Sequence, residues 1–160
     1  MSLEIVSISP EFDPVVKEVI KKVGEEFGAV GEGYGPSDPE VENMSRYYTL
    51  ENKSRYYVAL KDGVVVGGCG VAPFTEGSST CELKKLFLLE GARGLGLGKA
   101  LSNHCLEFAK EQGFTQCYLD TLSNMNSAVR LYEKLGFEHL SAPLEGTLHN
   151  MCDVWMLKTL

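Results

Sequence analysis

Hydrophobic and polar positions along the chain follow two different periods. Residues 3–8, LEIVSI, alternate apolar with polar side chains, which predicts a β-strand. Residues 12–27 repeat apolar side chains every three or four positions, which predicts a helix that Gly28 ends. The run 55–73 is rich in β-formers and is interrupted by Asp62-Gly63, the strongest short signal of a hairpin. The first half therefore predicts a strand, a helix and a hairpin.

The second half of the chain alternates strand and helix patterns. Glycine follows each helical pattern, as is typical of helix ends. The predicted elements are a strand at 80–89, a helix at 97–112, a strand at 115–121, a helix at 126–135, a short strand at 137–140 and a last strand at 152–158. Together with the first half, this order predicts a single mixed α/β domain over residues 1–160, without repeats or linkers.

Residues 28–54 break both periods. This segment is rich in glycine and includes two prolines, and Ser37-Asp38-Pro39-Glu40 is typical of the start of a short helix. Long loops in compact domains are commonly functional. We therefore expect this segment to border the substrate.

Composition narrows the class of protein. The chain has 15 Lys and Arg against 22 Asp and Glu, a net charge of -7, and its only basic pairs, Lys21-Lys22 and Lys84-Lys85, are too short for a phosphate-backbone surface. A nucleic-acid partner is therefore disfavoured. The five cysteines are scattered without a metal-ligand spacing, which predicts inert thiols in a reducing, cytoplasmic setting. No apolar window is long enough to span a membrane, and the N-terminus lacks the pattern of a secretory leader.

The stretch 92–101, ARGLGLGKAL, is a glycine-rich turn that opens a helix, and such a turn is suited to a phosphate group. A Walker A loop is excluded because Arg93 stands where its first glycine belongs and Ala100 replaces the hydroxyl residue. A dinucleotide fingerprint is met only in part, because Lys99 occupies its third glycine position. A strand-to-helix connection without any ligand remains an alternative.

A third pattern, R/Q-x-x-G-x-G/A, is met by residues 93–98. The strand LKKLFLL precedes it, and YLDT and AVRLYEKLGF follow it. In this order and spacing, residues 80–140 resemble the GNAT superfamily of N-acetyltransferases, and the hairpin at 55–73 resembles the preceding strands. The resemblance implies a mostly antiparallel sheet that splays between strands 80–89 and 115–121, with helices on both faces and acetyl-CoA in the splay.

The resemblance also implies which residues bind acetyl-CoA. The glycine turn would hold the pyrophosphate and the strand end would pair with the pantetheine arm, with the Leu88 N–H as oxyanion donor. Many relatives carry an asparagine where this chain has Met125, so either Asn124 or Asn126 substitutes or the backbone alone holds the pantetheine arm. A helix N-cap is the favoured alternative for Asn126. The predicted cofactor-binding residues are Leu86, Phe87, Leu88, Arg93, Gly94, Leu95, Gly96, Leu97, Gly98, Lys99 and Asn126.

Two residues are candidates for the chemistry. Tyr132 matches a tyrosine that many family members direct at the thioester sulfur, and a phenol suits a general acid; simple packing is the alternative. Glu82 matches a general base of several members; an exposed position at the start of its strand is the alternative. The three histidines are interpreted as structural or surface residues, and no metal ligands are predicted.

These features predict an enzyme that transfers acetyl from acetyl-CoA to a primary amine by direct attack. A small molecule is favoured as acceptor, and the acidic loop 31–40 favours a cationic amine. A non-catalytic acyl-CoA-binding sensor is the alternative from another class, and a nucleotide-dependent oxidoreductase is a third. The C-terminal strand with Trp155 is a candidate seam for a homodimer.

Overall fold

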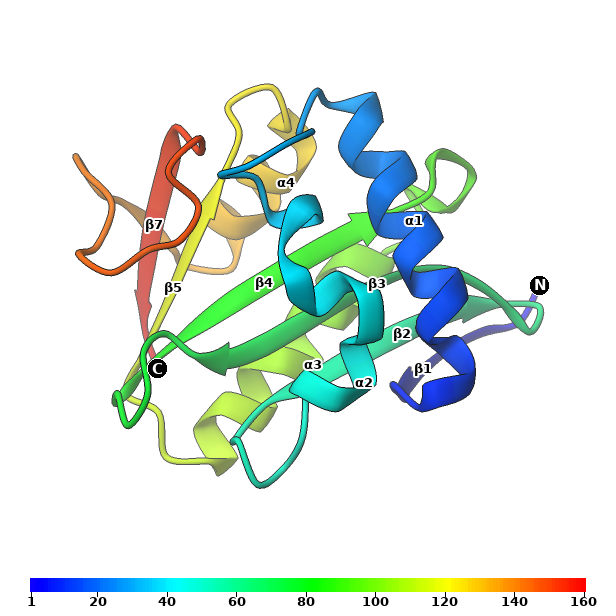
Figure 1. Cartoon of the computed structure of the whole chain (residues 1–160), viewed down its shortest axis with the longest axis horizontal. Coiled ribbons are helices and arrows are strands. Elements are labelled where there is room, and N and C mark those ends of the chain that lie inside the picture. The colour runs from blue at the N-terminus through cyan, green and yellow to red at the C-terminus, as the bar shows by residue number, and fades with distance from the viewer.

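One seven-stranded sheet organises the chain. The computed structural model describes residues 1–160, and Figure 1 shows the sheet between helices on its two faces. The strands, in spatial order, are β1 (Leu3–Ser7), β2 (Arg55–Lys61), β3 (Val64–Pro73), β4 (Thr80–Leu88), β5 (Gln116–Thr121), β7 (Val154–Thr159) and β6 (Glu138–His139). Only β4 and β5 run parallel, and all other neighbours are antiparallel.

The helices also match the predicted order. They are α1 (Asp13–Glu26), α2 (Met44–Tyr47), α3 (Leu97–Glu111) and α4 (Asn126–Lys134), with 3-10 turns η1 (Pro10–Phe12), η2 (Gly35–Ser37), η3 (Pro39–Asn43) and η4 (Glu90–Ala92). The short helix predicted after Ser37 is η3 continued by α2. Asp38 precedes it, but its side chain makes no capping hydrogen bond. None of the helices combines the length and apolar composition needed to cross a membrane.

Two hydrophobic cores lie on the two faces of the sheet. Because successive residues of a strand point to opposite faces, Val58 packs in the core beneath α1, whereas Ala59 packs in the core beneath α3. In Figure 1, α1 and α2 lie in front of the sheet, and α3 and α4 lie behind it. All five cysteines are free, and four of them are buried in the α3 core: Cys69, Cys81, Cys105 and Cys117.

The predicted splay lies between β4 and β5. The two strands pair at only three positions, Thr80 with Gln116, Cys81 with Cys117 and Glu82 with Tyr118. Beyond Glu82, β5 continues to pair with β7, while the edge of β4 that faces β5 has no strand partner. The sheet therefore opens into a wedge at the carboxyl end of β4.

A bulge interrupts β4 just after its pairing with β5 ends. Lys84 pairs with Gly70 and Phe87 pairs with Gly68, so Lys85 and Leu86 stand opposite a single residue of β3. Lys85 has a φ of 54°, an unusual left-handed conformation for a lysine. The Tyr56 hydroxyl donates a 2.8 Å hydrogen bond to the carbonyl of Lys85 and so fixes the bulge from the neighbouring core.

Gly68 gives Tyr56 the space that this contact needs. A Cβ at Gly68 would collide with the Tyr56 ring and lie 2.8 Å from the carbonyl oxygen of Tyr57, whereas a Cβ at Gly91 would meet nothing within 4 Å. Gly68→Ala should therefore lower the free energy of unfolding by about 1–3 kcal/mol, as overpacking does. Chemical denaturation measures the change, and Gly91→Ala is the control that should stay near the wild type. Equal stability of both variants would contradict this account of the bulge.

Candidate active site

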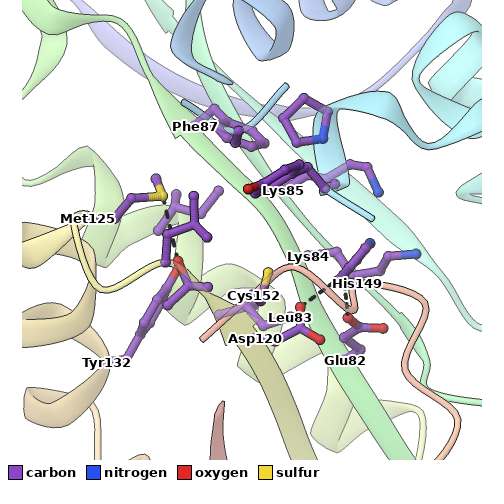
Figure 2. Close-up of a pocket in the computed structure, with 17 residues that line it drawn as sticks. Glu82, Leu83, Lys84, Lys85, Phe87, Asp120, Met125, Tyr132, His149 and Cys152 are labelled. Carbon is purple, nitrogen blue, oxygen red and sulfur yellow. Dashed lines mark hydrogen bonds and ion pairs between the residues drawn. The ribbon is translucent and has the colours of Figure 1, made fainter. Parts of the chain in front are cut away.

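Two cavities meet where β4 and β5 separate. A large cleft of about 630 Å³ runs along the end of β4 to the start of α3, and a small pocket of about 70 Å³ lies deeper in the splay. Leu86, Phe87 and Met125 line both. In the pocket, Figure 2 shows Tyr132 and Met125 on one side, with Glu82, Lys84 and His149 on the other. The unpaired edge of β4 thus joins two chemically different spaces.

The glycine turn forms the far end of the large cleft. Gly94 and Gly96 have φ values of 77° and 80°, and Gly96 is the N-cap residue of α3. The first helical hydrogen bond runs from the Ala100 N–H to the Gly96 carbonyl, which leaves the preceding N–H groups without helical partners. A Cβ on Gly94 or Gly96 would meet nothing within 4 Å. The turn therefore needs glycine for its backbone angles, and it presents free N–H groups to open space that suits an anion.

The side chains of this turn have divided roles. Gly94, Gly96, Gly98 and Lys99 line the large cleft, as expected of cofactor-binding residues. Leu95 and Leu97 instead pack into the core beneath α3. Their predicted contribution to cofactor binding is therefore limited to backbone atoms, because the spacing of the motif does not distinguish a side chain in the cleft from one in the core.

Arg93 also lines the cleft, but its guanidinium is held within the chain. It makes a two-pronged ion pair with Glu26, with distances of 2.5 and 2.8 Å, and lies 5.2 Å from the centre of the Phe27 ring. The hydrogen bond to Glu26 is the main cause that raises the pKa of Arg93. The Arg93 side chain also donates two hydrogen bonds to the Leu88 carbonyl, from Nε at 3.1 Å and from Nη2 at 2.9 Å. Arg93 thus joins α1, the glycine turn and the end of β4.

The end of β4 directs backbone groups into the opening. The Leu89 N–H donates to the Val66 carbonyl of β3 at 2.8 Å. Because neighbouring residues of a strand direct their N–H groups to opposite sides, the Leu88 N–H faces the wedge between β4 and β5. This position is compatible with the oxyanion role expected of it.

The residues before α4 differ from the expected helix cap. Met125, not Asn126, is the N-cap residue of α4. The Asn124 side chain donates a 2.8 Å hydrogen bond to the Phe27 carbonyl and so links this loop to α1. Asn126 lines the large cleft. The Asn124 side chain is therefore occupied by a contact within the chain, whereas the Asn126 side chain makes no such link.

The two candidates for the chemistry both line the small pocket. Glu82 is only 8% exposed and stands at the last paired position of β4 and β5, so the alternative of a solvent-exposed strand start is wrong. Tyr132 projects from α4 and is 6% exposed. Its ring packs edge-on against Phe137, with ring centres 5.9 Å apart, and burial raises the pKa of its phenol well above the usual value. Tyr132 therefore combines core packing with a position on the pocket.

His149 is the residue of this pocket that the sequence interpretation missed. Its Nδ1 lies 2.9 Å from Asp120 Oδ1 and 3.5 Å from Glu82 Oε2, and its Nε2 lies 2.7 Å from Asp38 Oδ2. The four residues come from four separate segments of the chain. No local pattern could identify the histidine, because each of its partners lies at least 29 positions away.

His149 is positively charged in this pocket, and it keeps the neighbouring Asp38 ionised. Burial alone would lower the pKa of His149, but hydrogen bonds to Asp120, Asp38 and Glu82 outweigh it and raise the pKa to about 11. Burial would likewise raise the pKa of Asp38, but the hydrogen bond from His149 and the charge of Lys85 lower it to about 2. At neutral pH, His149 is therefore an imidazolium that holds carboxylates together. It is not a free base.

The acidic loop predicted to attract a cationic amine is already neutralised. Lys85 Nζ lies 2.8 Å from Asp38 and 3.2 Å from Glu40, and Lys84 Nζ lies 3.0 Å from the other oxygen of Glu40. The Lys85 side chain is only 1% exposed, so these contacts are shielded from water. Two of the three acidic groups of loop 31–40, Asp38 and Glu40, therefore give no support to a cationic acceptor, because they bind lysines of β4.

The sequence also predicted no cluster of metal-ligating side chains. The structure places donor atoms of Glu82, Asp120 and His149 within 4.8 Å of one another. Hydrogen bonds of a protonated imidazole account for this arrangement, because Nδ1 donates to Asp120 and Nε2 donates to Asp38.

Comparisons with known proteins agree with this geometry. The model of the acetyltransferase (GNAT) family matches residues 22–137. The chain is 40% identical over 150 residues to the uncharacterized N-acetyltransferase YjgM of Escherichia coli (strain K12), covering 92% of this chain and 89% of that protein. It is 35% identical over 103 residues to the human N-acetylaspartate synthetase, covering 64% of this chain and 34% of that protein. The structure of PaiA N-acetyltransferase from Thermoplasma acidophilum in complex with coenzyme A aligns over 100% of both chains, with a TM-score of 0.80 and 20% identity.

A splayed sheet with a glycine turn at the start of α3 is thus the fold of an N-acetyltransferase. The chain belongs to the acetyltransferase (GNAT) family. This membership confirms the predicted fold, the predicted class of enzyme, an acyltransferase, and acetyl-CoA as its co-substrate.

Protonated His149 should stabilise the fold in a pH-dependent way. Its pKa rises from 6.5 to about 11 on folding, so its stabilisation is complete below pH 6.5 and is lost as the pH rises toward 11. His149→Asn should destabilise the protein at about pH 7. As the pH rises, the difference in free energy of unfolding between the wild type and His149→Asn should shrink by up to about 1.4 kcal/mol per pH unit. Urea unfolding at about pH 7, 8 and 9 measures it.

His139 provides the control for this measurement. It is exposed and pairs with Glu133 at the surface. His139→Asn should change the free energy of unfolding by no more than about 0.5 kcal/mol at any of these pH values. A wild-type advantage over His149→Asn that stays constant with pH would show that His149 is not held as a buried cation.

Proposed function

We propose that the protein transfers the acetyl group of acetyl-CoA to the primary amine of a small molecule. The observation that carries this proposal is the free edge of β4, which runs from the free N–H groups of α3 to the pocket that holds Glu82 and Tyr132. The amine nitrogen attacks the thioester carbon, the carbon–sulfur bond breaks, the amine loses a proton and the thiolate gains one. We assign these events to groups of β4 and to Tyr132 of α4.

Acetyl-CoA is proposed to lie in the large cleft. Its pyrophosphate would accept hydrogen bonds from the N–H groups of Gly94, Gly96, Gly98 and Lys99, with the Lys99 charge beside it. The pantetheine arm would pair with the edge at Leu86, Phe87 and Leu88, with Asn126 beside it. Arg93 contributes by fixing the Leu88 carbonyl and the turn, since its guanidinium is bound to Glu26. The Leu88 N–H would then stabilise the oxyanion that forms from the thioester carbonyl.

Proton transfer is assigned to Glu82 and Tyr132. A carboxylate can take the proton from the incoming ammonium, directly or through a water. A protonated phenol can donate to the leaving thiolate, and burial keeps the Tyr132 phenol protonated because it raises the pKa. Both roles need one group on each side of the thioester, and Figure 2 shows these side chains on opposite sides of the pocket.

Two observations support a small acceptor in particular. The pocket beyond the cleft has a volume of only about 70 Å³. The human relative is named for the synthesis of N-acetylaspartate, the acetylated form of a free amino acid.

A reducing compartment such as the cytoplasm is also proposed, and it is supported by five free thiols. A homodimer seam at Trp155 stays a prediction.

The pyrophosphate assignment predicts the behaviour of two glycine variants. Gly96 and Gly113 lie at opposite ends of α3, both have positive φ, and a Cβ on either meets nothing within 4 Å. Gly96→Leu should abolish stabilisation by coenzyme A, whereas Gly113→Leu should keep the roughly 2.7 kcal/mol expected at 100 times the Kd. Thermal-shift titration with acetyl-CoA, coenzyme A and NADPH measures both. Unchanged coenzyme A affinity in Gly96→Leu would refute the assignment, and stabilisation by NADPH alone would favour an oxidoreductase.

The role of Tyr132 predicts a split between turnover and affinity. Tyr132→Phe keeps the ring that packs against Phe137 and removes only the hydroxyl. The kcat should fall about 100-fold or more, while the Kd for acetyl-CoA stays within about threefold. Thiol release and calorimetry measure the two quantities. Tyr57→Phe, which alters a half-buried tyrosine of β2 beside His104, is the control and should keep full activity.

The same assays separate an enzyme from a non-catalytic protein that only binds acyl-CoA. A fully active Tyr132→Phe enzyme would remove this phenol from the chemistry. A wild-type protein that binds acetyl-CoA but releases no thiol with any amine would favour the non-catalytic acyl-CoA-binding module.

A further inference from the structure

A segment of the chain borders the small pocket and pairs its carboxylates with the lysines that line it. The volume of this pocket is about 70 Å³, whereas pockets for small molecules commonly measure about 300–1,000 Å³. Residues 35–43, here called the cover segment, comprise η2 and η3, and Gly35 and Pro36 line the pocket. An acceptor larger than an amine head group therefore has to take the place of groups that the cover segment now supplies.

Those groups are two carboxylates on a preformed cationic site. The two oxygens of Glu40 lie 3.0 Å from Lys84 Nζ and 3.2 Å from Lys85 Nζ, and Tyr48 donates a hydrogen bond to the same carboxylate. Asp38 bridges Lys85 at 2.8 Å and His149 at 2.7 Å. One planar carboxylate thus occupies a fork made by consecutive lysines.

The backbone of β4 is distorted at this fork. Consecutive residues of a regular strand point to opposite faces, yet Lys84 and Lys85 contact the same carboxylate. The bulge, with its positive φ at Lys85, accounts for this arrangement. Buried lysine is unfavourable without an anion, and ion pairs of this kind add little stability over apolar packing. The bulge therefore places two buried lysines where they need an anionic partner.

The balance of charge indicates what can replace the cover segment. Four carboxylates, from Asp38, Glu40, Glu82 and Asp120, face three cations, from Lys84, Lys85 and His149. If the carboxylates of the cover segment leave, three cations face two carboxylates. A simple alkylammonium would add another positive charge to this excess, whereas an amino acid would add none as a zwitterion and would cancel the excess once its amine is deprotonated for attack.

We propose that the acceptor is a small amine that also carries a carboxylate, and that this carboxylate binds Lys84 and Lys85 in the place of Glu40. This inference rests on the proposed acetyl transfer and names its substrate class. The amine would lie toward Glu82, which lines the same small pocket as Lys84 and Lys85. Both ends of an amino acid would then find partners of opposite charge.

The test compares matched acceptors in the full chain. Free amino acids are assayed for thiol release from acetyl-CoA beside their carboxamides and their decarboxylated amines. At least one free amino acid should exceed both of its matched derivatives by about 10- to 100-fold in kcat/KM, as expected for a charge-assisted contact. Equal or better use of the derivatives would overturn the inference. So would binding of acetyl-CoA without turnover of any carboxylate-bearing amine.

Variants of Lys84 test whether the lysines cause the preference for a carboxylate-bearing acceptor. Lys84→Gln should raise the KM of the preferred amino acid about 10- to 100-fold and abolish its advantage over the carboxamide. Lys84→Arg should restore most of that advantage, which a purely structural role would not predict. Lys110→Gln, at an exposed position of α3, is the control and should behave as the wild type. A preference that survives Lys84→Gln in a folded protein would overturn the site.

Failure of the proposed function gives a different result. Thermal-shift titration of the same variants with acetyl-CoA should give equal stabilisation in Lys84→Gln and the wild type, because Lys84 lies outside the large cleft. Absence of stabilisation in the wild type would reject acetyl transfer itself, and the substrate class with it. Normal stabilisation without a carboxylate preference would reject only the substrate class.

Discussion

The structure depends on the early end of pairing between β4 and β5. Parallel neighbours normally exchange hydrogen bonds along their whole length, but here the ladder ends at Glu82. The rest of β4 then has backbone groups that face an opening, and buried backbone groups need partners. The edge of β5 that faces β4 is likewise unpaired beyond Tyr118, while its other edge pairs with β7 up to Thr121. The unpaired edge of β4 is therefore a site where an extended ligand with amide groups can complete the sheet.

The charged residues of the pocket follow from the same opening. Lys84, Lys85 and Glu82 belong to β4 at the point where it leaves β5. They are balanced by groups from the cover segment and the loop before β7. Removal of one partner from such a buried cluster leaves an uncompensated charge, which costs about 3–5 kcal/mol. The cluster thus fixes the position of its members more than it adds net stability.

Local patterns predicted the fold well, and the site only in part. The hairpin at Asp62-Gly63 and the turn at Gly94 and Gly96 carry their information in neighbouring residues, so sequence alone sufficed. Alternation along β4 would place Lys84 and Lys85 on opposite faces, and nothing local announces the bulge that brings them together. His149 has partners from three other segments. Such contacts depend on the tertiary fold, which spacing does not encode.

Helix α1 shows why the two halves of the site are supported together. Near its C-terminal end, Glu26 holds Arg93, which in turn fixes the Leu88 carbonyl at the edge of β4. One turn and a half earlier, Lys21 donates a 2.7 Å hydrogen bond to the Pro36 carbonyl of the cover segment. A helix of 14 residues that buries one face against the sheet moves as a unit. The glycine turn and the cover segment therefore share one support, so in the proposed complex the positions of the cofactor and of the acceptor would be set by the same element.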